Sequence, residues 1–208
     1  GGVENNLNED ILKQFSFAPD AGKAALFYMY AILSSSSYLD IFEGALYTPS
    51  DPSNPPRVPI ASDQQVRAVL VQLGEKIANC EKCLPLAKKH PKIAVKWPKE
   101  VNDFKLAKHK YDEADNTLTL IGEDKEEAFV TGVSSSVKDL SIAGHNVIDK
   151  WLRERKYAYL RRLFRKSDVD ELVNVILNIE IQSELLAKAD RIIKEFITNE
   201  DLLESKPV

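Results

Sequence analysis

The sequence predicts an α+β fold that is mainly helical, with a small antiparallel β-sheet in the middle and a long C-terminal helix. Apolar residues recur at helical spacing before residue 85 and after residue 145, whereas residues 91–132 hold short segments rich in Val, Ile, Thr and aromatic residues. The chain has 208 residues, 44% of them hydrophobic, and no internal repeat. We therefore expect one compact unit over residues 21–200, helical over 21–85, with the sheet over 91–132, and helical again over 145–200.

Two helices are expected near the start of the chain. Residues 1–10 are polar and acidic, and we interpret Gly1-Gly2 as a cloning remnant at an artificial boundary. We therefore expect residues 1–20 to be this remnant and an acidic N-terminal segment. Asp20 is suited to cap a helix over residues 21–35, which is apolar on most sides and should be buried. Ser37 is expected to cap a second, short helix that ends near Leu46.

A proline-rich connection leads to a third helix. Residues 48–59 contain five prolines, too many for a helix or a central strand, so we expect an extended surface segment. Ser62 and Gln65 have the spacing of a capping box, and the apolar residues that follow predict a helix to about Leu84.

Four segments then predict the sheet, and a final helix follows. The predicted strands are residues 92–97, 108–111, 116–121 and 127–130, with a turn over 112–116. Ser167 and Asp170 have the spacing of another capping box. The apolar positions after them predict a helix of about thirty residues that ends near Thr198.

Composition excludes several classes of protein. No apolar run approaches the roughly 18–20 residues of a membrane span, and no signal-peptide pattern begins the chain, so we expect a cytoplasmic protein with no membrane partner. Two cysteines fit a reducing compartment. Cys80-x-x-Cys83 leaves two alternatives: half of a zinc site completed by His90, His109 or His145, or buried thiols. Because there is no second cysteine pair, we expect no metal site.

Catalytic signatures are also missing from the sequence. The glycines form no Gly-rich strand-to-helix turn for a nucleoside cofactor, and the three histidines take part in no Ser-His-acid or Cys-His pattern. Asn54-Pro-Pro-Arg57 resembles the Asn-Pro-Pro-aromatic loop of amino-methyltransferases but has Arg57 in place of the aromatic residue. The chain alone is therefore not predicted to be an enzyme or to bind a small-molecule substrate.

Positive charge is concentrated in two segments of a chain whose net charge is −4. Residues 86–110 contain eight lysines against two acidic residues, and residues 150–166 contain eight lysines and arginines against one glutamate. This pattern is typical of a surface that binds a polyanion, two solvated faces being the alternative, and we expect the segments to converge on one positive surface. Trp97 among the lysines suits base or groove contact, with core packing as its alternative. The candidate DNA contacts are Lys88, Lys89, Lys92, Lys96, Trp97, Lys99, Lys105, Lys108, Arg153, Arg155, Lys156 and Arg162.

Several blocks of the sequence resemble a known family in their order and spacing. They are Phe27-Tyr-Met-Tyr-Ala-Ile-Leu33, Ser37-Tyr38, Pro56-Arg-Val-Pro59, Leu73-Gly74-Glu-Lys-Ile77 and the stretch from Val137 to Arg155 that contains Gly144 and Lys150-Trp-Leu152. These blocks are similar to the C-terminal part of type ISP and Eco57I-like restriction-modification DNA adenine methyltransferases. Ala143 and His145 replace the family's usual Gly and Tyr. The resemblance implies a target-recognition region that binds double-stranded DNA, with S-adenosylmethionine and the catalytic loop in an upstream methyltransferase domain.

We therefore expect the DNA-binding target-recognition domain of a restriction-modification or phage-defence enzyme, with no cofactor and no catalysis of its own. The alternative is a helical scaffold or protein-interaction module without DNA contact. The last helix discriminates between them through its apolar stripe Leu172, Ile176, Ile179 and Leu186. An exposed stripe favours partner docking, whereas a buried stripe favours DNA binding by the basic segments.

Overall fold

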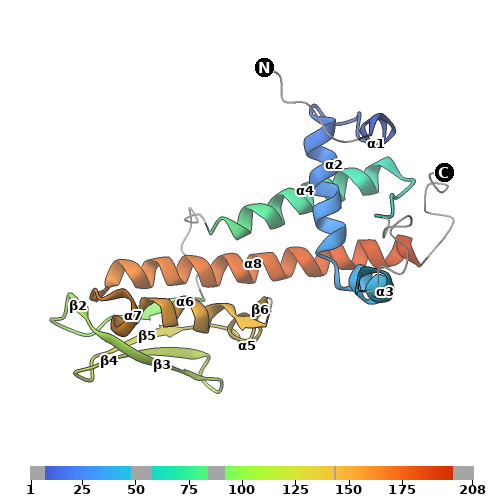
Figure 1. The fold of residues 1–208 in the computed structure, drawn as a ribbon. Coiled ribbons are helices and arrows are strands. Elements are labelled where there is room, and N and C mark those ends of the chain that lie inside the picture. The colour runs from blue at the N-terminus through green and yellow to red at the C-terminus, as the bar shows by residue number, and fades with distance from the viewer. Residues whose placement is uncertain (1–7, 48–57, 84–91, 143, 199–208) are drawn as a thin grey trace. The chain divides into compact units, whose positions relative to one another are not determined.

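The computed structural model describes residues 8–47, 58–83, 92–142 and 144–198. The chain divides into two compact units, where the sequence suggested one. Unit 1 comprises Gly1–Lys82 and Ile181–Val208, and unit 2 comprises the intervening Cys83–Glu180. Each unit has its own cluster of buried apolar side chains, and the last helix contributes to both clusters. Figure 1 labels the helices and strands of both units.

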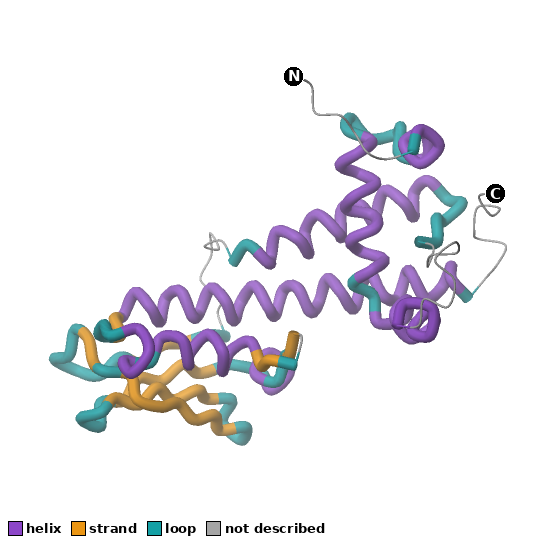
Figure 2. Tube along the Cα trace, in the orientation of Figure 1, coloured by secondary structure: helices purple, strands orange, loops and turns teal. Residues whose placement is uncertain are grey.

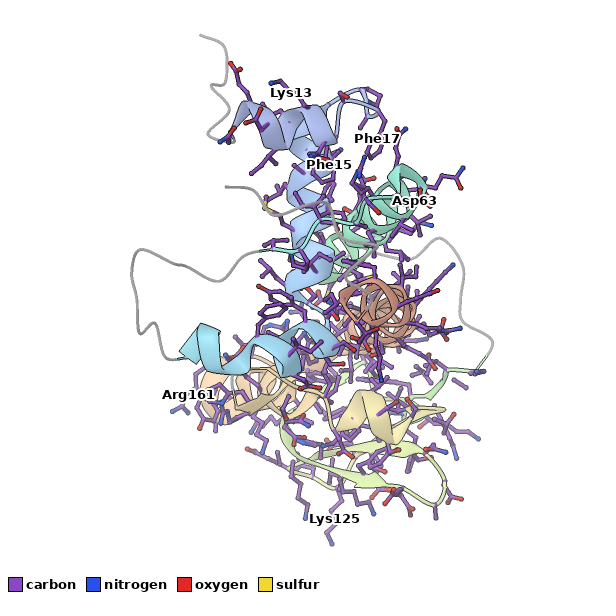
Figure 3. All side chains as sticks on the ribbon, turned by 90° about the vertical axis from the view of Figure 1, so that its right-hand side faces the viewer. Lys13, Phe15, Phe17, Asp63, Lys125 and Arg161 are labelled. Carbon is purple, nitrogen blue, oxygen red and sulfur yellow. The ribbon has the colours of Figure 1, made fainter. Side chains whose placement is uncertain are left out.

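Unit 1 is helical and begins earlier than predicted. It contains α1 (Glu9–Gln14), α2 (Ala21–Leu33), α3 (Ser36–Tyr47), α4 (Gln64–Glu81) and the second half of α8 (Lys166–Ile197). Helix α1 corrects the expectation of a merely polar and acidic segment over residues 1–20. Phe15, labelled in Figure 3, is 1% exposed and packs against Tyr28 with 5.2 Å between ring centroids. The segment before residue 21 therefore supplies part of the core of unit 1.

Two helix starts in unit 1 are capped by aspartates. Asp20 caps α2 as predicted, and its carboxylate accepts the Lys23 N–H at 2.9 Å. Helix α4 begins after Asp63, whose carboxylate accepts the Gln65 N–H at 2.6 Å. The predicted cap Ser62 is thus wrong by one residue. A carboxylate outcompetes a neighbouring hydroxyl here because its charge interacts favourably with the positive end of the helix.

The start of α3 is held by Asp190 of α8. Ser35 Oγ accepts the Tyr38 N–H at 3.3 Å, the role that the sequence assigned to Ser37. Ser37 instead donates its N–H and its hydroxyl to the Asp190 carboxylate at 2.8 and 3.1 Å, and the hydroxyls of Ser35 and Ser36 donate to it at 2.6 and 3.2 Å. Burial raises the pKa of Asp190, but these hydrogen bonds outweigh it and hold the pKa below its ordinary value.

Helices α2 and α4 approach each other closely at Gly74. A Cβ atom added at Gly74 would lie 1.9 Å from the carbonyl oxygen of Phe27, so the packing of the two backbones leaves no space for a side chain. Glycine inside a helix costs about 1 kcal/mol relative to alanine. The contact between the helices explains why glycine nevertheless occupies this position.

We expect Gly74→Ala to lower the Tm of the protein although alanine favours a helix. The gain in helix propensity is about 1 kcal/mol, whereas forcing two packed helices apart costs up to about 3 kcal/mol. Thermal unfolding followed by circular dichroism measures the difference. Gln72→Ala, at an exposed position of α4, serves as the control and should leave the Tm unchanged. A Tm for Gly74→Ala equal to or above that of the parent protein would contradict this account.

Unit 2 contains the antiparallel sheet predicted for the middle of the chain. Its strands are β1 (Ala94–Lys96), β5 (Glu127–Thr131), β4 (Thr117–Gly122) and β3 (Leu106–Asp112), in that spatial order. Lys125 lies in the turn between β4 and β5, at the end of the sheet (Figure 3). Two short ladders were not predicted: β2 (Asp103–Phe104) with β8 (Phe164–Arg165), and β6 (Ser141–Ile142) with β7 (His145–Asn146).

Helices of unit 2 cover one side of this sheet (Figures 1 and 2). They are α5 (Ser135–Lys138), α6 (Val147–Arg155), α7 (Tyr157–Leu160) and the first half of α8. Leu118, Leu120 and Val130 are fully buried and share a core cluster with Leu152 of α6 and Leu172 of α8. Alternate strand residues point the other way. We call that side the outer face, formed by Ala94, Lys96, Lys108, Lys110, Asp112, Thr117, Thr119, Ile121, Glu127, Phe129 and Thr131.

Helix α8 confirms the predicted long final helix, with 32 residues. Its start differs from the predicted capping box of Ser167 and Asp170, because Asp168 accepts the Arg165 N–H at 2.7 Å. The aromatic rings of Phe104 and Phe164, 5.8 Å apart, join this start to β2. Among the described residues, no helix combines the length and apolarity of a membrane span.

Candidate nucleic-acid interface

Helix α6 presents polar side chains to a pocket of about 360 Å³. Asn146 caps the helix, and its side-chain oxygen accepts the Asp149 N–H at 2.8 Å. Residues three or four apart on a helix share one side, which brings Lys150 and Arg153 to the same pocket, and Lys156 follows at the end of the helix. His109, Gly144 and His145 complete the lining together with Asn146 and Asp149.

The single carboxylate of this pocket is already paired. Asp149 lies 2.8 Å from His109 Nε2 and 3.1 Å from Lys138 Nζ. Burial raises the pKa of Asp149, but the hydrogen bonds from His109 and Lys138 outweigh it and hold the pKa below its ordinary value. Within the described part of the chain, Lys150 and Arg153 have no carboxylate partner. The pocket therefore has a net positive charge and suits an anionic group.

Two of the predicted arginine contacts are bound to the protein itself. The Arg155 guanidinium lies 3.5 Å from the centroid of the Trp151 ring and 3.6 Å from the Glu171 carboxylate. Arg162 donates two hydrogen bonds to the Asp168 carboxylate, at 2.8 and 2.6 Å. These partners anchor α6 and the start of α8. Part of the charge of both guanidinium groups is therefore neutralised within the chain, and their contact with phosphates stays a prediction.

Trp97 and Lys105 also make contacts within unit 2. The Trp97 ring packs against the core, 5.1 Å from the Phe104 ring, and its indole N–H donates to the Val101 carbonyl at 2.5 Å. The structure therefore favours core packing, the alternative to base contact. Lys105 Nζ lies 3.5 Å from the Glu123 carboxylate, so part of its charge is neutralised.

The remaining lysines of the first segment lie at or near the sheet. Lys92 precedes β1 in the sequence and Lys99 follows it, and both are exposed. Lys88 and Lys89 fall outside the described residues. Lys96 and Lys108 are exposed on the outer face.

The two basic segments meet at β3 but on its two sides. His109 of β3 contacts Asp149 of α6 at 2.8 Å, whereas the adjacent Lys108 and Lys110 point to the outer face. The single positive surface expected from the sequence is therefore replaced by two surfaces, the α6 pocket and the outer face.

Sequence reasoning missed three contributors to these surfaces. Lys150 and Lys110 belong to the basic segments but were not chosen, although Lys150 stands three residues before Arg153 and Lys110 two residues after Lys108. Helical and strand periodicity would have selected them. Asn146 joins the pocket as the cap of α6, a role that its position before the apolar Val147 and Ile148 indicates.

Neither cysteine of the Cys80-x-x-Cys83 pair lines the α6 pocket. Cys80 is buried on α4 and Cys83 is exposed. Within the residues that the structure describes, no three or more His, Cys, Asp or Glu side chains are grouped to hold a metal ion. His109 and His145 instead line the α6 pocket, and His90 is outside the described ranges.

Two solved structures are similar to this chain. One is a nuclease-deletion mutant of the Type ISP restriction-modification enzyme LlaGI in complex with a DNA substrate mimic, with a TM-score of 0.57 and 16% identity over 80% of this chain. The other is the ATP-dependent Type ISP restriction-modification enzyme LlaBIII bound to DNA, with a TM-score of 0.60 and 13% identity over 88% of this chain. At these identities the likeness shows the fold.

The match covers only a small part of each enzyme, 13% of the LlaGI chain and 12% of the LlaBIII chain. A comparison with curated proteins finds no match. The family model described as the Type ISP C-terminal specificity domain matches residues 1–194. This chain therefore belongs to the family of Type ISP C-terminal specificity domains.

Proposed function

We propose that this chain is the DNA-recognition domain of a site-specific restriction-modification enzyme, and that its α6 pocket contacts the phosphate backbone of duplex DNA. The observation that carries this proposal is the set of cations around the pocket. Lys150, Arg153 and Lys156 line it, while its one carboxylate, Asp149, is paired with His109 and Lys138. The DNA and the DNA mimic in the solved relatives support the same ligand.

Phosphate contacts of this kind fix the position of a protein on DNA without reading its sequence. The N-terminal end of α6 adds the partial positive charge of a helix start to the same pocket. His145 and Asn146 precede the helix at this end and line the pocket. Base edges would then be read by side chains next to these contacts.

In this proposal, methyl transfer is catalysed by another part of the parent enzyme. An upstream methyltransferase domain would bind S-adenosylmethionine and transfer the methyl group to a flipped adenine. The chain corresponds to about one eighth of each solved relative, which leaves room for such a domain.

The buried stripe on α8 argues against the scaffold alternative. Leu172 and Ile176 are 0% exposed and Ile179 is 5% exposed, while Leu186 is half-buried against the core of unit 1. This stripe is used within the chain and is not presented to a partner.

The salt dependence of duplex binding tests the proposed function. With three phosphates neutralised by Lys150, Arg153 and Lys156, the affinity for a random duplex should fall about fortyfold between 50 and 200 mM salt. Fluorescence anisotropy with a short labelled duplex measures this fall. A salt-independent affinity, or no binding at 50 mM salt, would contradict the proposal.

A further inference from the structure

We propose that the outer face of the sheet is a second nucleic-acid site, which binds a short single-stranded segment with an unpaired base stacked on Phe129. The site lies on the other side of β3 from the α6 pocket and does not depend on the duplex contact proposed above. The face combines an aromatic ring, flanking cations and hydrogen-bonding groups. Single-stranded nucleic acids are bound by this combination of groups.

Four side chains form one row across the outer face. Lys96 is opposite Phe129, Phe129 is opposite Thr119, and Thr119 is opposite Lys110 in the strand register. Because neighbouring strands lie about 4.8 Å apart, the α-carbons of the two lysines are about 14 Å apart with the ring between them. A nucleotide strand that crosses the sheet along this row meets one cation on each side of the stacked base.

The ring of Phe129 lines a hollow on this face. The hollow has a volume of about 440 Å³ and includes Lys96 and Lys110 in its lining. Lys96 Nζ lies 5.7 Å from the ring centroid, which is a cation–π distance but longer than van der Waals contact. A base that enters the hollow takes the place of this ammonium group over the ring. The displaced ammonium is then available to an adjacent phosphate.

Thr119 adds a hydrogen-bonding group to the hollow. It is 3% exposed and lines the hollow. The neighbouring Thr117 hydroxyl donates to the Asp115 carbonyl at 3.1 Å. The Thr131 hydroxyl donates to the Ala94 carbonyl at 3.3 Å. The polar edge of a base that enters the hollow would form a hydrogen bond with the Thr119 hydroxyl.

Two carboxylates fix the direction in which the base points. Asp112 and Asp115 line the same hollow, and Asp112 is opposite Thr117, two residues along the strands from the Lys110 and Thr119 pair. Carboxylates repel phosphates and accept hydrogen bonds from the amino groups of bases. The amino edge of the base is therefore directed to Asp112, and the phosphates remain beside the lysines. Cytosine, which has such an amino group, is the base of choice for a probe.

Binding of a labelled eight-nucleotide oligodeoxycytidine to the full chain tests this site. Fluorescence anisotropy at low salt should show saturable binding. Phe129→Leu keeps apolar packing but removes the aromatic face, and should weaken binding about tenfold. Thr119→Val keeps the shape but removes the hydroxyl, and should weaken binding about fivefold. The Tm of Thr119→Val should stay about equal because valine has the shape of threonine, and an equal Tm would show that the loss of binding is not a loss of folding.

The double variant Lys150→Glu/Arg153→Glu separates this site from the duplex site. It should weaken duplex binding while the affinity for oligodeoxycytidine changes less than about twofold. An equal loss for both ligands would assign the oligonucleotide to α6 and overturn the site on the sheet, but would leave the proposed function intact. Absence of binding, unchanged affinity in Phe129→Leu and Thr119→Val, or equally strong competition by a polyglutamate peptide would also overturn it.

Discussion

Reversal of charge at Lys150 and Arg153 should weaken the binding of duplex DNA about thirtyfold or more at 50 mM salt. Each lost contact with a phosphate is worth about 1 kcal/mol, and every 1.4 kcal/mol is a factor of ten. Lys150→Glu and Arg153→Glu remove two contacts and add two carboxylates that repel the DNA. The nearby Asp149 is paired with His109 and Lys138, so it cannot compensate. Anisotropy with a labelled random duplex measures the loss.

The second half of α8 offers a matched control for this experiment. Lys188 and Arg191 are exposed, lie in a helix, and have the same residue types and spacing as Lys150 and Arg153. Lys188→Glu/Arg191→Glu changes the net charge equally and should leave the affinity about the same. Equal weakening by both double variants would show that only total charge matters, and α6 would no longer be the contact surface.

Replacement of Asp168 by asparagine should lower the free energy of unfolding by about 2–3 kcal/mol. The Asp168 side chain is 3% exposed and accepts hydrogen bonds from both guanidinium nitrogens of Arg162 and from the Arg165 N–H. An asparagine keeps one acceptor but turns an amide donor toward the guanidinium. Denaturant unfolding followed by circular dichroism measures the difference.

Asp170→Asn is the control for this substitution. Asp170 is exposed two residues further along α8 and is the acid that the sequence assigned to the cap. Its replacement should change the free energy of unfolding by less than about 0.5 kcal/mol. A larger loss for Asp170→Asn than for Asp168→Asn would restore the cap predicted from the sequence.

The Asp168 carboxylate also makes the free energy of unfolding depend on pH. Burial raises the pKa of Asp168, but the hydrogen bonds from Arg162 and Arg165 outweigh it, so the pKa of the folded state is lowered. Such a group contributes its stability above its unfolded pKa of about 3.9 and loses it as the pH falls through the folded pKa. Stability should therefore fall below about pH 4, and this fall should be shallower in Asp168→Asn.

Apolar periodicity was sufficient to predict most helices and the four strands of the sheet. Repeats of two or 3.6 residues are set by neighbours in the sequence, so β1, β3, β4, β5 and α8 could be recognised locally. The ladder of β2 and β8 could not, because two residues contain no period and their partners are about sixty positions apart. Helix α1 was missed for a related reason: its apolar anchor, Phe15, follows the helix.

The hydrogen-bond and ion-pair partners of charged side chains could not be predicted from the sequence. Arg161 adopts a left-handed conformation with φ of 55°, and Arg162 then pairs with Asp168. Nothing in the residue types distinguishes that arginine from Arg153, which faces a pocket. The count of positive charges located the basic segments, but only the tertiary contacts divide their members into anchors and available cations.

Unit 2 is one uninterrupted stretch of chain, and unit 1 is formed by the residues before and after it. All candidate contacts from Lys88 to Arg162, the α6 pocket and the outer face fall within Cys83–Glu180. Phe15 and Ile193, from the two outer stretches, share the core cluster of unit 1. A genetic exchange with crossovers near residues 83 and 180 would thus transfer the whole recognition apparatus between relatives and leave the residues of the recipient's helical core unchanged.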